Sequence, residues 1–308
     1  MAMRKIYAYL FIPALLLGLA ACNKVAGPDV AAEDSDTEIV FAAYENIGDP
    51  ETKAVTETTT ANLAAIKVTA MTATAYVFQN TSFSKSGDVF KGEKYWPSTD
   101  GSWKFALANT DMAGTYSAPT VSPANANTDI VVGYLASPEY KASSTSGKTA
   151  VTLSHIFARL GTITMKEPAG YEVTNLKVTI SPKTSGTYTL SSNTWTTKGS
   201  ASSAVYLFGS AGSGYDLHGN SGSHTNTADF MLVPDTYTIT ATYTISKDSY
   251  TANKTATASV TFPQGQTTNI GLVGGTTPNI PVPTDIAELQ FSITVTGWGT
   301  NNQTPAFN

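Results

Sequence analysis

The sequence predicts an all-β protein built from two tandem β-sandwich domains. The first observation is composition, because 48 Thr and 28 Ser among 308 residues give one small hydroxyl side chain in every four. Thr, Val, Ile and Tyr favour the pleated, half-buried surface of a sheet over a helix. The second is strict alternation of apolar residues and Thr, clearest in 237–245 (YTITATYTI). The third is length, which fits about two domains.

The first 21 residues have the pattern of an export signal. Arg4 and Lys5 supply a positive start, and an apolar run of 16 residues follows at 6–21. This run is shorter than the ~20 residues that a membrane-spanning helix needs. It ends in LAAC, and small residues before the single Cys22 are typical of the lipobox of bacterial lipoproteins. We therefore expect removal of residues 1–21 and acylation of Cys22, with an ordinary signal peptide as the alternative.

Charge and cysteine content exclude several classes of protein. The net charge is -5 and Arg4 and Arg159 are the only arginines, which argues against a nucleic-acid partner. Loss of residues 1–21 leaves 16 basic and 23 acidic residues, a net charge of -7 that suits an extracellular surface. One cysteine permits neither an intrachain disulfide nor a metal cluster built on cysteines.

Residues 22–53 are predicted to form a lipidated tether and a first strand. The stretch 23–36 is small, acidic and unpatterned, which is typical of a flexible tether. A strand is predicted at 37–44 (TEIVFAAY), and a polar segment follows at 46–60.

The later strands fall into two groups, which we divide at the turn cluster 166–170 (KEPAG). The N-terminal sandwich is assigned to 54–166 and the C-terminal sandwich to 167–308, with a last strand in 286–308. Short strands separated by turns are typical of sandwiches. The strands are predicted at 66–70, 73–78, 103–107, 129–135, 150–157 and 161–165, then at 171–180, 186–190, 204–208, 230–233, 236–245, 255–262, 268–273 and 289–295.

Candidates for chemistry are few. His155 lies on a predicted strand, where a core histidine is the expected role. His218 and His224 lie six residues apart in a Gly/Ser loop and make a weak metal pair. P-loop and calcium-loop motifs are absent from the sequence. We therefore assign no catalytic residue, metal or cofactor, and expect no enzyme activity.

Aromatic residues offer a second kind of site. Tyr95 and Trp96, followed by Trp103 and Phe105, could stack on a sugar ring. The interpretation that we favour is that these tryptophans close one end of a sandwich.

A series of short motifs resembles the fimbrillin family of Bacteroidetes, which are lipoprotein precursors of surface fimbriae. Each motif is weak alone, and their order carries the resemblance. Asp235 departs from the family pattern, where Gln is common, and 262–265 (FPQG) lacks a common Trp. The motifs are LAAC (19–22), IVF (39–41), TKA (52–54), KYWP (94–97) before WKF (103–105), DIVVGY (129–134), VTLSHIFARL (151–160), GTY (186–188) with Trp195, and FMLVP (230–234).

The resemblance implies transthyretin-like sandwiches and assembly by strand exchange. In that family a trypsin-like protease removes the first strand, which here is 37–44, with the cut at Lys53–Ala54. The groove then accepts a strand from a neighbouring subunit. Here the donor would be 289–295, which alternates apolar and polar residues. Its four apolar side chains on one face are Leu289, Phe291, Ile293 and Val295.

The leading hypothesis is a structural subunit of cell-surface fimbriae that supports adhesion. Its implied partners are other fimbrial subunits, the outer membrane through the lipid on Cys22, and a host or bacterial surface ligand. One alternative is an uncleaved outer-membrane anchor or accessory protein of the fimbria. Another is a glycan-binding surface lipoprotein that uses Trp96, Trp103, Trp195 or Trp298.

Overall fold

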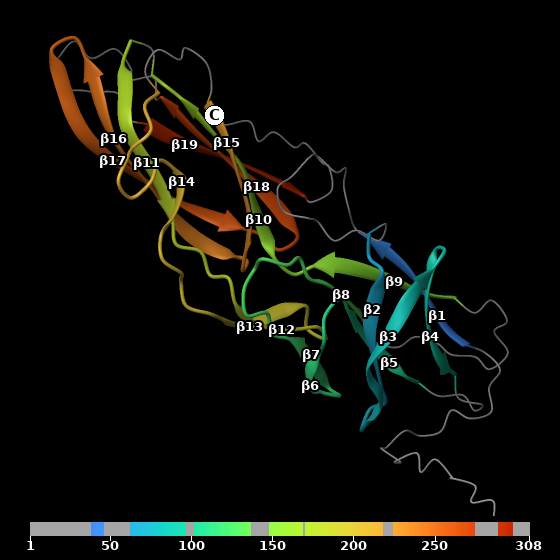
Figure 1. Cartoon of the computed structure of the whole chain (residues 1–308). Coiled ribbons are helices and arrows are strands. Elements are labelled where there is room, and N and C mark those ends of the chain that lie inside the picture. Colours follow the sequence, from blue (N-terminus) through green and yellow to red (C-terminus); the bar gives the residue numbers. More distant parts are fainter. Residues whose placement is uncertain are drawn as a thin grey trace, which may run out of the picture.

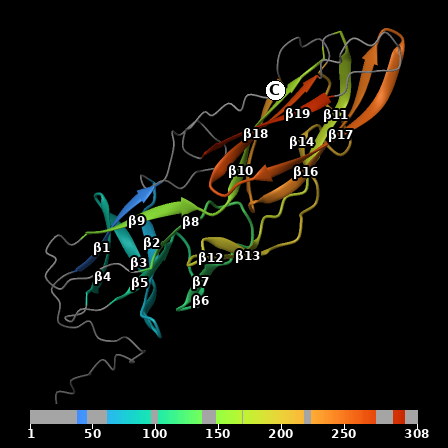
Figure 2. The ribbon, with the colours of Figure 1, turned by 180° about the vertical axis from the view of Figure 1, so that it is seen from behind.

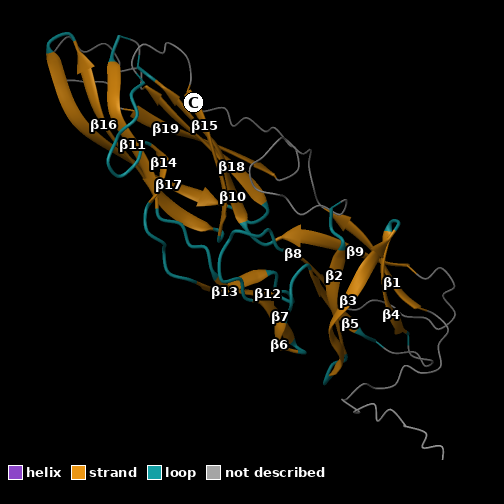
Figure 3. Cartoon of the chain, viewed as in Figure 1, coloured by secondary structure: helices purple, strands orange, loops and turns teal. Residues whose placement is uncertain are grey.

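The chain is all-β, as the sequence predicts. A computed structural model describes residues 38–45, 62–96, 102–136, 148–168, 170–217, 224–274 and 289–297. These residues form 19 strands and no helix, arranged in two lobes joined by a small sheet (Figures 1 and 3). The described residues include no helix that is long and apolar enough to cross a membrane.

The N-terminal lobe is a closed barrel of seven strands in the order β1-β4-β3-β2-β5-β8-β9. It closes because β1 pairs with β4 on one side and with β9 on the other. The sequence predicts a β-sandwich here, and the difference arises from this double pairing of β1. The strands are β1 (Glu38–Glu45), β2 (Ala65–Met71), β3 (Tyr76–Ser86), β4 (Val89–Tyr95), β5 (Lys104–Ala108), β8 (Val131–Leu135) and β9 (Lys148–His155).

The C-terminal lobe is a sandwich of two four-stranded sheets. One sheet has the order β15-β10-β18-β19 and the other β14-β11-β16-β17. Apolar side chains from both sheets share one buried cluster, in which Ile163 and Ile270 meet Val178 and Ile239. The strands are β10 (Ala158–Lys166), β11 (Glu172–Ile180), β14 (Val205–Phe208), β15 (His224–Leu232), β16 (Asp235–Lys247), β17 (Tyr250–Phe262), β18 (Gln266–Gly274) and β19 (Leu289–Gly297).

A third sheet links the two lobes (Figure 2). It has the order β13-β12-β7-β6, so β7, which precedes β8 of the barrel, pairs with β12, which follows β11 of the sandwich. A separate core cluster lies at this junction and includes Val132 of the barrel and Tyr188 of β12. The strands are β6 (Ala113–Thr115), β7 (Ala118–Val121), β12 (Gly186–Thr189) and β13 (Thr194–Lys198).

The sheets change between β9 and β10, one strand earlier than the division at 166/167 drawn from the sequence. β9 pairs with β1 and β8 in the barrel, whereas β10 pairs with β15 and β18 in the sandwich. The turn cluster 166–170 joins the two sheets of one sandwich, because β10 and β11 lie in different sheets. A turn signal in the sequence does not tell whether the chain is leaving a sheet or a domain.

Candidate assembly interface

The first strand fills a slot between two strands of the barrel. β1 runs parallel to β9, with residues 40–45 opposite 148–153. It runs antiparallel to β4, with a register shift between Glu38 and Val40. Both edges of β1 are therefore paired with a neighbouring strand. Loss of β1 would leave β4 and β9 each without a partner on one side.

The inward side chains of β1 belong to the barrel core. Ile39 and Phe41 have no exposed surface. The Phe41 ring meets Phe83 and Phe105 edge-on, with ring centroids 5.5 and 5.2 Å apart. Such aromatic pairs stabilise beyond their buried area. Removing β1 would therefore open an apolar groove as well as two strand edges.

Polar contacts fix the outer end of β1. The Glu38 carboxylate lies 3.8 Å from the Lys91 ammonium and accepts a hydrogen bond of 3.4 Å from the backbone N–H of Glu93. Lys91 has about half of its side chain exposed, so the ion pair contributes little compared with the buried Ile39 and Phe41.

The predicted processing bond Lys53–Ala54 and the predicted lipidation site Cys22 lie outside the described residues. β1 ends at Glu45 and β2 begins at Ala65, so the bond lies in the connection between them. A cut at this bond would leave β1 attached to the barrel by noncovalent contacts alone.

The predicted donor strand is found as β19, at an edge of the sandwich. It pairs antiparallel with β18 along its whole length, from Leu289 opposite Gly274 to Gly297 opposite Gln266. The sheet order ends at β19, so its described pairing is on one side only. Phe291, Ile293 and Val295 lie opposite Leu272, Ile270 and Thr268 in the register.

His155 is a buried core histidine, as the sequence predicts. Its Nδ1 lies 2.8 and 3.0 Å from the two Asp129 carboxylate oxygens, and both side chains are almost fully buried. The pair joins the end of β9 to the residues before β8, beside the junction of the lobes. Asp129 is 26 residues away in the chain, so sequence spacing gives no sign of this partner. Of the weak metal pair, His218 lies outside the described residues and His224 is described by its backbone alone, as the first residue of β15.

None of the three described tryptophans proposed for sugar stacking is a surface platform. Trp96 and Trp103 are 5% and 6% exposed and pack on each other and on Phe105, which confirms the core interpretation. Trp195 is half-buried at the lobe junction and its Nε1–H donates to the Ile156 carbonyl at 2.9 Å. Trp298 lies outside the described residues.

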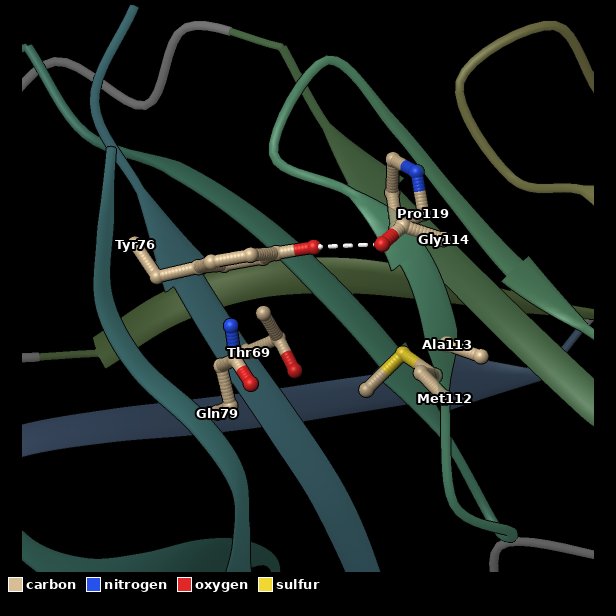
Figure 4. A pocket seen from close by; sticks show the side chains of 7 residues that line it. All are labelled: Thr69, Tyr76, Gln79, Met112, Ala113, Gly114 and Pro119. Carbon is tan, nitrogen blue, oxygen red and sulfur yellow. Dashed lines mark hydrogen bonds between the residues drawn. The ribbon is translucent and has the colours of Figure 1, made fainter. Parts of the chain in front are cut away.

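A shallow pocket of about 90 Å³ lies between the barrel and the β6–β7 hairpin (Figure 4). The Tyr76 hydroxyl crosses it and donates to the Gly114 carbonyl at 3.0 Å. Pockets that bind small molecules usually enclose about 300–1,000 Å³, so this space is small for a sugar ligand. The lining comprises Thr69, Tyr76, Gln79, Met112, Ala113, Gly114 and Pro119.

The residue that departs from the family pattern anchors the first strand of the β16–β17 hairpin. The Asp235 carboxylate accepts a hydrogen bond from Lys183 at 2.8 Å and lies 3.3 Å from the Lys198 ammonium. The Lys183 hydrogen bond lowers the pKa of Asp235 below its usual range, and the backbone N–H of Thr236 and Lys198 add to this effect. The neighbouring Tyr237 hydroxyl donates to the Val233 carbonyl at 2.6 Å, and burial raises its pKa. These contacts tie the start of β16 to β13 and to the residues before β12.

Comparison with known proteins decides the family. Residues 52–298 match the model of the fimbrillin-like family, which is most of the chain. The protein belongs to the fimbrillin-like family. This fimbrillin-like chain has the fold of a fimbrial protein from Bacteroides vulgatus, with a TM-score of 0.51 at 14% identity over 85% of this chain and 100% of that one. The tip fimbrial protein Mfa3 from Porphyromonas gingivalis, truncated at its C-terminus, matches with a TM-score of 0.39 at 9% identity over 75% of this chain and 93% of that one. No curated protein matches the sequence.

Membership of this family supports a fimbrial subunit that lies at the cell surface and associates with other fimbrial subunits. It also favours a structural role over an enzymatic one.

Proposed function

We propose that this fimbrillin-like protein is a structural subunit of cell-surface fimbriae that supports adhesion and polymerises by proteolysis-triggered strand exchange. It is exported as a lipoprotein acylated at Cys22 and held in the outer membrane. A trypsin-like protease then cuts Lys53–Ala54, β1 leaves the barrel, and β19 of a neighbouring subunit takes its place.

The observation that carries this proposal is the position of β1. It is paired on both sides and buries Ile39 and Phe41, so its departure would create a groove rather than shorten a sheet. The family match begins at residue 52, one residue before Lys53, and leaves β1 outside the matched region.

The donor strand has the chemistry that the groove requires. A strand that adds to a sheet gives affinity through backbone hydrogen bonds and specificity through alternate side chains. Four large apolar anchors in β19 could contribute about 6–12 kcal/mol before entropy costs. Head-to-tail addition of this kind does not close on itself, so it gives a filament.

Controlled proteolysis tests the trigger. The uncleaved chain is treated with a protease that cuts after Lys or Arg, and products are followed by electron microscopy and sedimentation. We expect filaments from the wild-type chain and none from Lys53→Gln, with Lys85→Gln, at a half-buried position near the end of β3, as the matched control. Filaments from Lys53→Gln, or a trimmed wild-type chain that stays monomeric, would contradict the proposal.

A capping experiment tests the donor. A cleaved chain that lacks residues 289–308 can accept a strand but cannot give one. Added in small amounts to the cleaved wild-type chain, it should shorten the filaments in proportion to its share. If filament length does not change, β19 is not the donor.

The second candidate is an uncleaved fimbrial anchor held by Cys22. The observation that favours it is that β1 completes a closed barrel, which leaves no strand edge in that lobe. The amino terminus of the protein in sheared surface material separates the two functions.

A further inference from the structure

The free edge of β17 is the longest in the sandwich. β17 pairs with β16 over all 13 of its residues without a register shift, from Tyr250 opposite Lys247 to Phe262 opposite Asp235. The sheet order ends at β17, and no strand in the described part of the chain pairs with its other side. A row of backbone N–H and C=O groups on that side is thus available to another strand.

This edge has few of the features that usually prevent strands from pairing. Charged side chains, prolines and bulges protect exposed edges in most proteins. Residues 251–262 contain one charged residue, Lys254, and no proline, and the register has no bulge. The outward side chains are all small, uncharged and exposed, namely Thr251, Asn253, Thr255, Thr257, Ser259 and Thr261.

The sequence of β17 is complementary to itself in an antiparallel arrangement. If two copies of β17 pair antiparallel with Ala256 opposite Ala256, the midpoint of the strand, all 13 residues of each strand take part. This pairing sets Thr255 against Thr257 and Asn253 against Ser259, which are pairs that can hydrogen-bond across strands. It also sets Lys254 against Ala258, so like charges do not meet. The Thr236–Thr261 hydroxyl contact of 2.9 Å between β16 and β17 shows that this face already forms such pairs.

We propose that β17 is a docking edge for a second copy of this chain, which pairs antiparallel to it about a twofold axis at Ala256. The two four-stranded sheets would become one continuous sheet of eight strands. The turn of the β16–β17 hairpin lies at the end of the sandwich farthest from the barrel (Figures 1 and 2).

This contact is different in kind from head-to-tail assembly. A twofold contact uses the same surface on both copies and closes as a dimer. In a fimbria it would join two neighbouring filaments side by side. It requires neither cleavage at Lys53 nor release of β1, so it can fail or succeed independently of the proposed strand exchange.

Placing charged residues on the outer face of β17 tests whether two copies pair there. The protein used is the full uncleaved chain with Cys22→Ser, so that no lipid drives association, and its oligomeric state is measured by sedimentation velocity over a range of concentrations. We expect a monomer–dimer equilibrium that Thr255→Lys with Thr257→Lys weakens about tenfold or more, because like charges then face each other. Ser82→Lys with Ser84→Lys adds the same charge at exposed positions of β3 and should leave the equilibrium unchanged.

Two further variants test the register and guard against an effect on folding. Mixing the Lys variant with Thr255→Glu and Thr257→Glu should restore a dimer, since opposite charges then meet. Ala256→Cys, in the same Cys22→Ser chain, should form a disulfide-linked dimer on mild oxidation, whereas Ser82→Cys should not. A chain that stays monomeric at every concentration, or a dimer that persists in the Lys variant with an unchanged dissociation constant, would overturn the proposal.

Discussion

The two lobes differ in whether their sheets have edges. Every strand of the barrel has a neighbour on both sides, whereas the sandwich ends in four edge strands, β14, β15, β17 and β19. A closed barrel offers no backbone to a partner until a strand leaves, while an edge strand can accept a further strand as it stands. The proposed acceptor groove and the proposed donor strand lie in different lobes, the closed barrel and the open-edged sandwich.

The largest expected loss of stability comes from a substitution in β1, and it tests how far the barrel depends on this strand. Phe41→Ala should lower the free energy of unfolding of the uncleaved chain by about 3–5 kcal/mol, because it removes a fully buried ring between Phe83 and Phe105. Urea unfolding measures this, with Val40→Ala at a half-buried position of the same strand as control. Equal losses in the two variants would mean that the strand is held by its backbone alone.

The second-largest expected effect concerns the buried Asp129–His155 pair at the junction of the lobes. Asp129→Ala should cost about 2–4 kcal/mol, because the buried His155 ring then loses its carboxylate partner. Asp129→Asn keeps an oxygen that can accept from Nδ1 and should cost less. Thermal unfolding of both variants checks the order, and a smaller loss for Ala than for Asn would refute the role of this pair.

A smaller effect concerns the sandwich and depends on pH. The Asp235 carboxyl has a lower pKa in the folded chain than the usual value of about 3.9 in an unfolded one, mainly because Lys183 donates to it. Its stabilisation is therefore present above about pH 4 and is lost as the pH falls through the folded pKa. We expect about 1 kcal/mol or less, since the partners are partly exposed. Asp235→Asn should reduce the loss of stability between about pH 4 and pH 2, measured by urea titration, and an unchanged slope would exclude this group.

The smallest effect concerns the hairpin that packs on the barrel. Tyr76→Phe removes only the hydroxyl that donates to the Gly114 carbonyl at a partly exposed position, so it should cost about 0.5–1 kcal/mol. Hydrogen exchange of the β6–β7 amides should quicken while the β2 and β5 amides stay protected. Equal quickening in all four strands would mean that the hairpin and the barrel open as one unit.

Local pattern predicts strands well where one face is buried. The alternation in 237–245 becomes β16, with Ile239, Tyr243 and Ile245 buried and the intervening Thr residues facing out. The sequence does not predict β4, β6, β7 or β13. Strands β6 and β7 are very short, β13 is mostly exposed and Thr-rich, and β4 is interrupted by Gly92. In such strands the pairing partner, rather than the burial pattern, decides the structure.

Features that join distant parts of the chain could not be predicted. The barrel closes through parallel pairing of β1 with β9, more than 100 residues apart, and no local signal specifies that partner. The same holds for the Asp129–His155 pair and for the pairing of β7 with β12. The candidate processing and lipidation residues, by contrast, are predictions from short motifs, which are local by nature.

The most direct measurement of the central claim is the amino-terminal sequence of this subunit in fimbriae sheared from the native cell. The proposed strand exchange predicts Ala54 at the amino terminus of the polymerised chain. An acylated Cys22, or any start before Lys53, on every copy within the fibres would show that β1 stays in place and would contradict the account.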